Sequence, residues 1–476
     1  MTKSTGYLFT TASLLIAYIA YYTHLKYLLV SVLILLWLYC ILYSFKKIND
    51  RIVLCSFLLT FFAFLLSRTF VDTLLPDFES DYTTNAISKR AYSDNASLFI
   101  LFSLVVSLVG LFVGYISDKS HVKASRIKEN PMYLSRVRYI SKRLTYLLFT
   151  FALLVTLEKV RYIWANGYLS YYLSYRESMP HVFYTLAVAY KFAFFIFLST
   201  MPSKGEAKIL ILLYVFDACV SLLTGQRGAF ITPLLFILIY FFIRNSLSPE
   251  DPWLGKKGKI AIAVSLPLLS AAMFLVMLIR GEDETGGYGF TTLFVNFFYQ
   301  LGGSESIIGY SYDMKSLIPD GQWYSLGPII RFLKGNPIAY LFGFGETIDY
   351  QSVEMATRGH ELGSFLTYNT DSYRYLNGGN LASSYVAELW LDFGMIGVFI
   401  GNVIYGRILA AIGSITSFSV WKATIAFVMM NRILTAPRGS FAFFITDCLS
   451  FAFIVMVIYI IGRCKGIPHY ISRQQD

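Results

Sequence analysis

Charged residues are scarce in this sequence: they make up 14% of its 476 residues. An ordinary soluble domain carries about a quarter. Together with a hydrophobic content of 56%, this shortage excludes an ordinary soluble protein and indicates a polytopic membrane protein. Cysteine is also rare. The five cysteines lie in or beside apolar runs and form no Cys-x-x-Cys pair, which argues against a disulfide framework or a zinc site. HExxH, GxSxG and Walker-type motifs are absent, which argues against hydrolases and ATPases.

The hydrophobic content is concentrated in long runs. Runs of roughly 17–25 apolar residues are long enough to cross a bilayer as helices. We predict an all-α polytopic membrane protein with about twelve transmembrane helices, at about 6–22, 26–45, 52–71, 98–116, 144–160, 183–202, 209–224, 229–243, 260–280, 391–412, 420–435 and 442–462.

The basic residues predict the orientation in the membrane. The net charge is +11, but much of the basic excess lies in short connections beside the runs, which does not suggest a nucleic-acid partner. The connection 117–143 carries eight basic residues, whereas 71–85, on the opposite side, carries four acids and no base. Because basic loops stay in the cytoplasm, both termini are expected there.

One connection is far longer than the others. Residues 281–390 form a segment rich in Tyr, Gly and Asn, on the external side of the expected topology. Loops of this length are usually functional, and we expect short helices in it, at 290–301 and within 326–345. The predicted organisation is therefore nine helices in 1–280, an external loop at 281–390, and three helices with a cytoplasmic tail in 391–476.

Several arginines lie on the external side, where basic residues are not expected. Arg227, Arg280 and Arg438 each precede a glycine at the external end of a run, in TGQRGAF, LIRGED and TAPRGSF. Glycine permits close approach to a guanidinium, whose planar fork suits a phosphate. These arginines together would form an anion site. The alternative is that each pairs with an acid or extends to the headgroups.

The external segment also carries aromatic residues between polar ones, in QWYSL (322–326) and TYNTDSYRYLNGGN (367–380), which include Tyr324 and Tyr373. Aromatic rings can stack on sugars while hydroxyls and amides bond to the sugar rim. An aromatic belt at the membrane interface explains the same residues equally well.

Two stretches carry a family resemblance: LTGQRGAF (223–230) and NGGNLASSYVAELWLDFGMIGVFIGNVIYG (377–406). With the long external segment between them, they resemble the Wzy-type oligosaccharide repeat-unit polymerases, which make O-antigen and capsule in bacteria. The resemblance implies a GT-C-like glycosyltransferase of the cytoplasmic membrane whose active site faces outward. It implies undecaprenyl-diphosphate-linked oligosaccharide as donor and acceptor, no cofactor and no metal, and a polysaccharide chain-length regulator as a partner.

That chemistry suggests roles for particular residues. Positive groups must stabilise the departing lipid diphosphate, and Arg227 and Arg280 are the candidates, with Arg438 in support. A base must take the proton of the acceptor hydroxyl, and His360 and Glu388 are the main candidates, beside Glu346 and Glu361. Glu388 could instead be a structural partner. Further substrate contacts are expected from Arg331 and Arg358 on the external side, and from Arg432 in the outer part of the run 420–435.

Two other functions remain open from the sequence. An O-antigen ligase uses the same donor with a different acceptor. A flippase for lipid-linked oligosaccharides would also have many spans and internal cations, but this sequence lacks repeated halves with paired broken helices.

Overall fold

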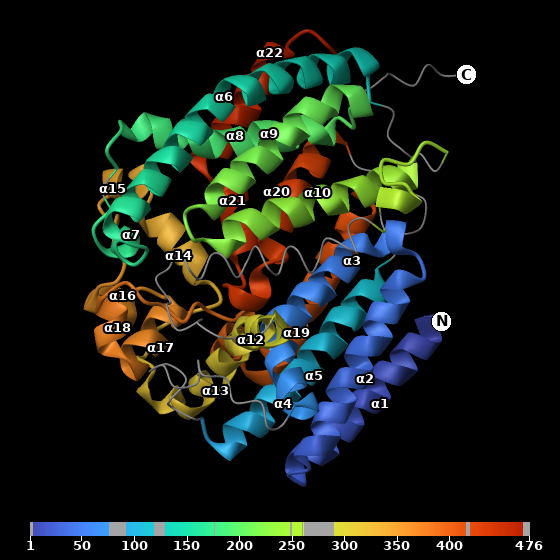
Figure 1. Ribbon diagram of the computed structural model, residues 1–476, viewed down its shortest axis with the longest axis vertical. Helices are drawn as coiled ribbons and strands as arrows, with labels where there is room; N and C mark the ends of the chain where they lie inside the picture. Colours follow the sequence, from blue (N-terminus) through green and yellow to red (C-terminus); the bar gives the residue numbers. More distant parts are fainter. Residues whose placement is uncertain are drawn as a thin grey trace. The chain divides into compact units, whose positions relative to one another are not determined.

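The computed structural model places the chain in two compact units, in which the described residues form helices, turns and irregular connections but no β-strand (Figure 1). The first unit comprises Met1–Asp118, Glu284–Ala410 and Ile433–Thr446, and the second comprises Lys119–Asp283, Ala411–Arg432 and Asp447–Asp476. The structure describes residues 3–75, 92–118, 129–175, 177–247, 250–258, 260, 290–415 and 419–469.

The first unit contains the long N-terminal helices, one long C-terminal helix and the short helices of the segment between them. In Figure 1 the N-terminal helices lie side by side, and α1 packs on α2 and α5. The elements are α1 (Lys3–Tyr22), α2 (Lys26–Phe45), α3 (Ile48–Phe61), the π-helix η1 (Phe62–Leu66), α4 (Ser67–Leu74), α5 (Asp94–Ser117), α12 (Phe290–Leu301), η3 (Gly302–Ser304), α13 (Glu305–Asp313), η4 (Lys315–Leu317), α14 (Gly327–Lys334), α15 (Pro337–Leu341), α16 (Val353–Arg358), α17 (Leu362–Thr370), α18 (Ser372–Leu376), α19 (Tyr385–Gly413, in this unit to Ala410) and η6 (Ala436–Arg438).

Helices α5 and α19 approach each other closely enough for backbone contact. A Cβ atom on Gly114 would lie 2.2 Å from the carbonyl oxygen of Val403, so only glycine permits this packing. Beside it, the buried hydroxyls of Ser107 and Tyr385 both donate to the amide oxygen of Asn402, at 2.9 and 2.7 Å. Small residues and interhelical hydrogen bonds are the usual basis of helix packing in lipid.

The second unit is built on α6, which packs along α8 and α9. Helix α9 begins with a capping box between Ser203 and Glu206, and Arg138 of α6 pairs with Glu206 at 3.3 Å. The elements are α6 (Pro131–Asn166), α7 (Ser170–Leu173), α8 (His181–Ser199), α9 (Lys204–Leu222), α10 (Arg227–Leu247), α20 (Val420–Ile433, in this unit to Arg432), α21 (Phe443–Leu449, in this unit from Asp447) and α22 (Phe451–Arg463).

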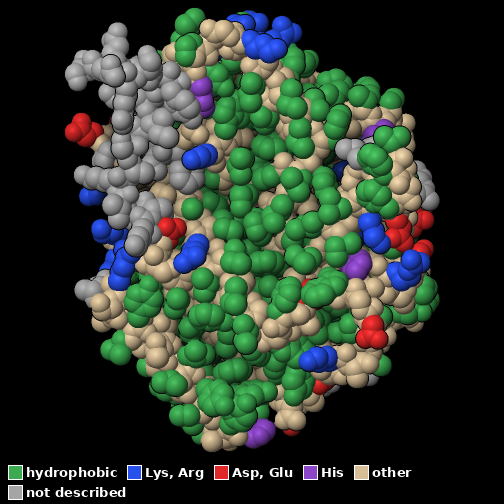
Figure 2. All heavy atoms as spheres, turned by 180° about the vertical axis from the view of Figure 1, so that it is seen from behind, with side chains coloured by type: hydrophobic (Ala, Val, Ile, Leu, Met, Phe, Trp, Pro, Cys, Tyr) green, Lys and Arg blue, Asp and Glu red, His purple; other side chains and the backbone are tan. Residues whose placement is uncertain are grey.

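Seven described helices are long and apolar enough to span a membrane, or eight if α21 and α22, bent by 47°, form one span. Hydrophobic side chains cover much of the face in Figure 2, as expected for contact with lipid. Of the twelve expected spans, 6–22 and 209–224 are helical but less apolar, 420–435 contains the 14-residue α20, and 260–280 lies outside the described residues apart from residue 260. The seven are Lys26–Phe45, Ile48–Leu74, Asp94–Ser117, Pro131–Asn166, His181–Ser199, Arg227–Leu247 and Tyr385–Gly413.

Candidate functional site

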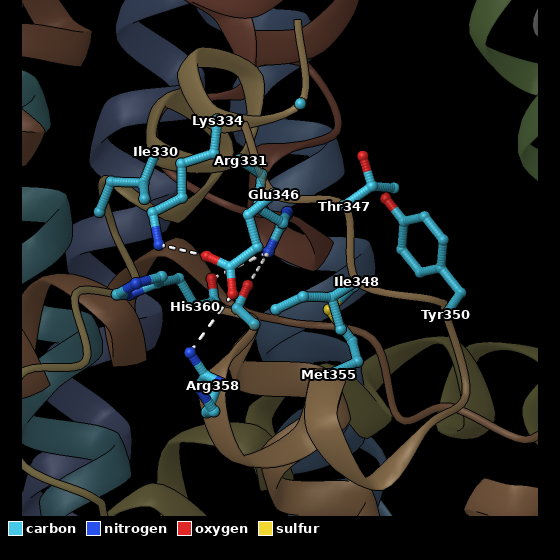
Figure 3. Close-up of a pocket in the computed structure, with 12 residues that line it drawn as sticks. Ile330, Arg331, Lys334, Glu346, Thr347, Ile348, Tyr350, Met355, Arg358 and His360 are labelled. Atoms are coloured by element: carbon cyan, nitrogen blue, oxygen red, sulfur yellow. Dashed lines mark hydrogen bonds and ion pairs between the residues drawn. The ribbon is translucent and has the colours of Figure 1, made fainter. Parts of the chain in front are cut away.

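The short helices of the first unit enclose a pocket that is rich in charged side chains (Figure 3). It has a volume of about 180 Å³ and lies between α14, the following connection, and α16. Four residues considered from the sequence are among those that line it: Arg331, Glu346, Arg358 and His360. The full lining is Ile330, Arg331, Lys334, Gly335, Glu346, Thr347, Ile348, Tyr350, Met355, Arg358, Gly359 and His360.

Helix α14 supplies two of the cations. Arg331 and Lys334 are three residues apart, so they share a face of this helix. The helix begins at Gly327 with Pro328 in its first turn, where proline is well tolerated. A Cβ atom on Gly327 would lie 2.0 Å from the carbonyl oxygen of His360, so glycine here allows α14 to contact the other wall of the pocket.

Glu346 is the carboxylate at the centre of these cations. One oxygen accepts from the ammonium of Lys334 at 2.6 Å, and the other lies 3.3 Å from the guanidinium of Arg358 (Figure 3). The hydrogen bond and charge of Lys334 lower the pKa of Glu346, which makes this carboxylate a poorer base. Arg358 also pairs with Glu354 at 3.1 Å. The lining residues carry three cations against one carboxylate, so the pocket favours an anionic or strongly polar group.

Arg331 stabilises the backbone turn that carries His360. Its guanidinium donates to the carbonyl oxygens of Gly359 and His360, at 3.0 and 2.9 Å. His360 adopts φ of 50°, in the left-handed region that is unusual for a residue other than glycine. The energy of this conformation is offset by the two bonds from Arg331 and by the bond from the His360 amide to Gln322 Oε1, at 3.1 Å.

The surroundings of the His360 imidazole favour its neutral form. Burial lowers its pKa, and the charges of Lys334 and Arg331 lower it further. Its Nδ1 accepts a hydrogen bond from the amide of Trp323 at 3.1 Å, so the neutral ring carries its proton on Nε2. An acceptor hydroxyl would have to replace the Trp323 amide before Nδ1 could take its proton.

Glu388 and Asp392 lie one turn apart at the start of α19. Glu388 is buried, and its carboxylate accepts from the hydroxyls of Ser383 and Ser440, both at 2.7 Å. It also accepts from the amide of Phe441 at 2.9 Å. Asp392 accepts from the amide of Ser325 at 2.8 Å. The two carboxylates therefore fix two separate connecting segments to the same helix end.

Tyr324, Tyr373 and Arg438 lie elsewhere in the first unit. Tyr324 is 2% exposed, so its ring packs inside the unit, and its hydroxyl has no hydrogen-bond partner among the described residues. Tyr373, by contrast, is 79% exposed on α18. Arg438 is exposed at the end of η6, two residues before Ser440, which Glu388 holds.

The remaining candidates belong to the second unit. Arg227 is the first residue of α10, after the turn 223–226 in which Gly225 has φ of 74°. The helix thus begins two residues earlier than the sequence suggested. Arg432 forms a bidentate ion pair with Asp447, at 2.8 and 3.1 Å, although its side chain is 45% exposed. Arg280 lies outside the described residues.

The pocket contains one important residue that sequence reasoning did not select, Lys334. Its spacing from Arg331 in IIRFLKG was the available signal, since residues three apart on a helix share a face. Glu346 was considered only as a base, and its role between two cations depends on tertiary contacts. Among the described residues, no group of three or more His, Cys, Asp and Glu side chains could hold a metal ion.

The model of a protein family described as O-antigen polysaccharide polymerase Wzy matches residues 6–467, nearly the whole chain. No curated protein and no solved structure matches.

Proposed function

Because the chain belongs to the Wzy family of O-antigen polysaccharide polymerases, we propose that it joins undecaprenyl-diphosphate-linked repeat units on the outer face of the bacterial cytoplasmic membrane. The family acts on lipid-linked oligosaccharides in membranes, and the apolar helices agree with an integral membrane protein. The carrier, the face of the membrane, a GT-C-like arrangement of about twelve helices with cytoplasmic termini, and cooperation with a chain-length regulator are parts of the proposal.

The proposed reaction transfers a glycan between two lipid carriers. A hydroxyl oxygen of the acceptor repeat unit attacks the anomeric carbon of the donor glycan. The bond from that carbon to the donor diphosphate breaks, and the lipid diphosphate leaves with the electron pair. The proton of the hydroxyl passes to a base of the protein. No bond of a nucleotide sugar is consumed, and the residues assigned below act as charges, donors and a proton acceptor.

Arg227 and Arg280 are assigned to the departing diphosphate, and Arg438 supports them. Guanidinium groups stabilise the charge that develops on the phosphate oxygens, and they stay protonated at any physiological pH. The position of Arg227 at the start of α10 supports this assignment, because the amides of a helix N-terminus also attract anions.

His360 is assigned as the base, and Glu388 as the residue that holds Ser440 and Phe441 in place. The surroundings that lower the pKa of His360 favour the neutral ring, which is the form that can accept a proton. Three hydrogen bonds to the buried Glu388 carboxylate support the positioning role. The proposal assigns glycan contacts to Arg331, Arg358, Arg432, Tyr324 and Tyr373; of these, the first two line the pocket and Tyr373 is exposed.

The observation that carries the proposal is the family match over residues 6–467. The ligase alternative, which shares the donor, is not favoured by any described feature, and the flippase alternative is opposed by the family match. The division into nine helices, an external loop at 281–390 and three further helices is kept as part of the proposal.

The test is reconstitution. The purified protein is mixed with lipid-linked repeat units from the producing cells, without nucleotide sugar. The expected product is a ladder of longer lipid-linked glycans, detected by gel electrophoresis. A protein that moves the substrate across vesicles without lengthening it would be a flippase. One that transfers a glycan only to a lipid A acceptor would be a ligase.

A further inference from the structure

The end of α6 and the connection from it to α8, in the second unit, carry an unusual concentration of aromatic residues. The sequence WANGYLSYYLSY (164–175) contains one tryptophan and four tyrosines within twelve residues. We call these five side chains the aromatic patch: Trp164, Tyr168, Tyr171, Tyr172 and Tyr175. None of them has a part in the function assigned so far.

The four tyrosines of the patch contact one another. The rings of Tyr171 and Tyr175 lie 4.9 Å apart at 34°, and those of Tyr171 and Tyr172 lie 5.3 Å apart, edge to face. The hydroxyls of Tyr168 and Tyr172 are hydrogen-bonded at 3.0 Å. The tyrosine rings therefore form an ordered surface, because each one restricts the orientation of its neighbour.

The patch is attached to the turn that precedes Arg227. The indole nitrogen of Trp164 donates to the carbonyl oxygen of Leu223 at 2.9 Å, and the side-chain amide of Gln226 donates to the hydroxyl of Tyr172 at 3.4 Å. Leu223 and Gln226 are the first and last residues of the turn between α9 and α10. The aromatic patch and Arg227 thus belong to one fixed local structure.

Trp164 combines exposure with a fixed orientation. Its side chain is 65% exposed even though its indole nitrogen is hydrogen-bonded, and Tyr172 beside it is 39% exposed. A residue that only anchors a protein at the membrane interface does not need a hydrogen bond to the backbone of a neighbouring turn. A rigid, exposed ring with hydroxyls around it suits the apolar face of a sugar.

We propose that the aromatic patch binds a sugar of the lipid-linked repeat unit whose diphosphate is held by Arg227, an inference that rests on the proposed function. The diphosphate is attached to the first sugar of the glycan. A diphosphate bound to Arg227 therefore brings that sugar next to the turn 223–226, to which Trp164 and Tyr172 are hydrogen-bonded. The patch orients the glycan while the arginine binds its anionic end.

The first test compares variants in the polymerisation assay. Trp164→Leu is expected to raise KM for the lipid-linked repeat unit about three- to tenfold, the loss of one aromatic stacking contact, and to leave kcat unchanged. Trp164→Phe is expected to keep most of the affinity. Tyr27→Leu is the matched control, since Tyr27 is an 85% exposed aromatic at the start of α2, in the first unit, and has no assigned role. A wild-type KM in Trp164→Leu would overturn the inference.

The second test measures contact without turnover. Oxidation of Trp164 by hydroxyl radicals is followed by mass spectrometry, with and without oligosaccharide released from the lipid carrier by mild acid. Protection of Trp164, but not of Tyr27, is expected. An unchanged oxidation rate of Trp164 at saturating oligosaccharide would show that the patch does not bind the glycan and serves as an anchor at the membrane interface. If Trp164 is protected but no ladder forms in reconstitution, the proposed function fails and the glycan site stands. If a ladder forms but Trp164 is not protected, the proposed function stands and the glycan site fails.

Discussion

The hydroxyl of Ser440 donates a hydrogen bond to the carboxylate of Glu388, with 2.7 Å between the two oxygens. The same carboxylate oxygen accepts from the amide of Phe441 at 2.9 Å. Ser440 and Phe441 follow Arg438 in the chain, separated from it by Gly439 alone. The first turn of α19 thereby fixes the position of the segment that carries Arg438. A single buried carboxylate on α19 therefore affects where this arginine lies.

Replacement of Glu388 by glutamine is expected to keep the fold and most of the elongation rate. Glutamine has the same size and keeps one oxygen for the donors of Ser440 and Phe441, and the hydroxyl of Ser383 can rotate to accept from the amide. Glu388→Ala is expected to lower stability by about 1–3 kcal/mol for each buried donor left without a partner. Thermal unfolding in detergent and the ladder assay measure both effects. Loss of elongation in a Glu388→Gln protein that unfolds at the wild-type temperature would make Glu388 the base instead.

Arg227→Ala is expected to reduce elongation about a hundredfold or more, as for loss of a group that stabilises charge in the transition state. Arg227→Lys keeps the charge but loses the planar fork, so it is expected to restore only part of the rate. Arg280→Ala is expected to resemble Arg227→Ala. Arg161→Ala serves as a control, since Arg161 is an exposed arginine in the second unit without an assigned role. Wild-type chain lengths in either alanine variant of the assigned pair would remove that residue from the site.

The charges around His360 predict opposite effects of two substitutions on its pKa. Lys334 lowers this pKa and Glu346 raises it. Lys334→Gln is therefore expected to raise the pKa of His360, and Glu346→Gln to lower it. Titration of the protein with ¹³C-labelled histidine, followed by NMR, measures both shifts. The chain has five histidines, so the signal missing in His360→Gln identifies the ring. Shifts of the same sign in the two variants would contradict the pocket described for the first unit.

The same pKa predicts how elongation depends on pH if His360 is the base. The ring is active when neutral, so kcat of the wild type is expected to stay constant at neutral pH and to fall only at a pH below the ordinary range of histidine. His360→Gln is expected to lose about a hundredfold in kcat and to lack this acid limb. An unchanged acid limb in the variant would assign the limb to another group. A wild-type rate would exclude His360 as the base.

The sequence predicted the apolar helices better than their interruptions. Helix α2 covers Lys26–Phe45, as expected, because a run of twenty residues that are almost all apolar has few alternatives in a membrane. Hydropathy gave no indication of the π-helix Phe62–Leu66, or of Gly394 with φ of 67° inside α19. Directly after the π-helix, the hydroxyl of Ser67 donates to the carbonyl oxygen of Phe298 at 2.7 Å, a contact between segments that lie far apart in the sequence.

The sequence predicted individual residues of the site but not how they lie relative to one another. The unexpected external charges identified Arg331 and Arg358, and the chemistry of proton transfer identified His360. That all three line one pocket follows from the packing of α14 on the turn at 359–360, which no spacing in the sequence encodes. Glu388 was left open between base and partner for the same reason, since its partners Ser440 and Phe441 are some fifty residues away.

A buried carboxylate outside the proposed site predicts a pH dependence of stability. Glu305, at the start of α13, is 3% exposed and accepts from the hydroxyl of Thr69 at 2.8 Å. Burial raises its pKa from 4.5 to about 7, so the folded protein binds a proton here that the unfolded chain has released between these pH values. The stability from this group is complete below pH 4.5 and is lost as the pH rises through 7. Glu305→Gln cannot ionise and keeps an oxygen for Thr69. Between pH 5 and 8, a range that includes the pKa of Glu305 in the folded protein, the unfolding temperature of this variant is therefore expected to fall less than that of the wild type. Parallel curves for the two proteins would show that Glu305 does not titrate in this range.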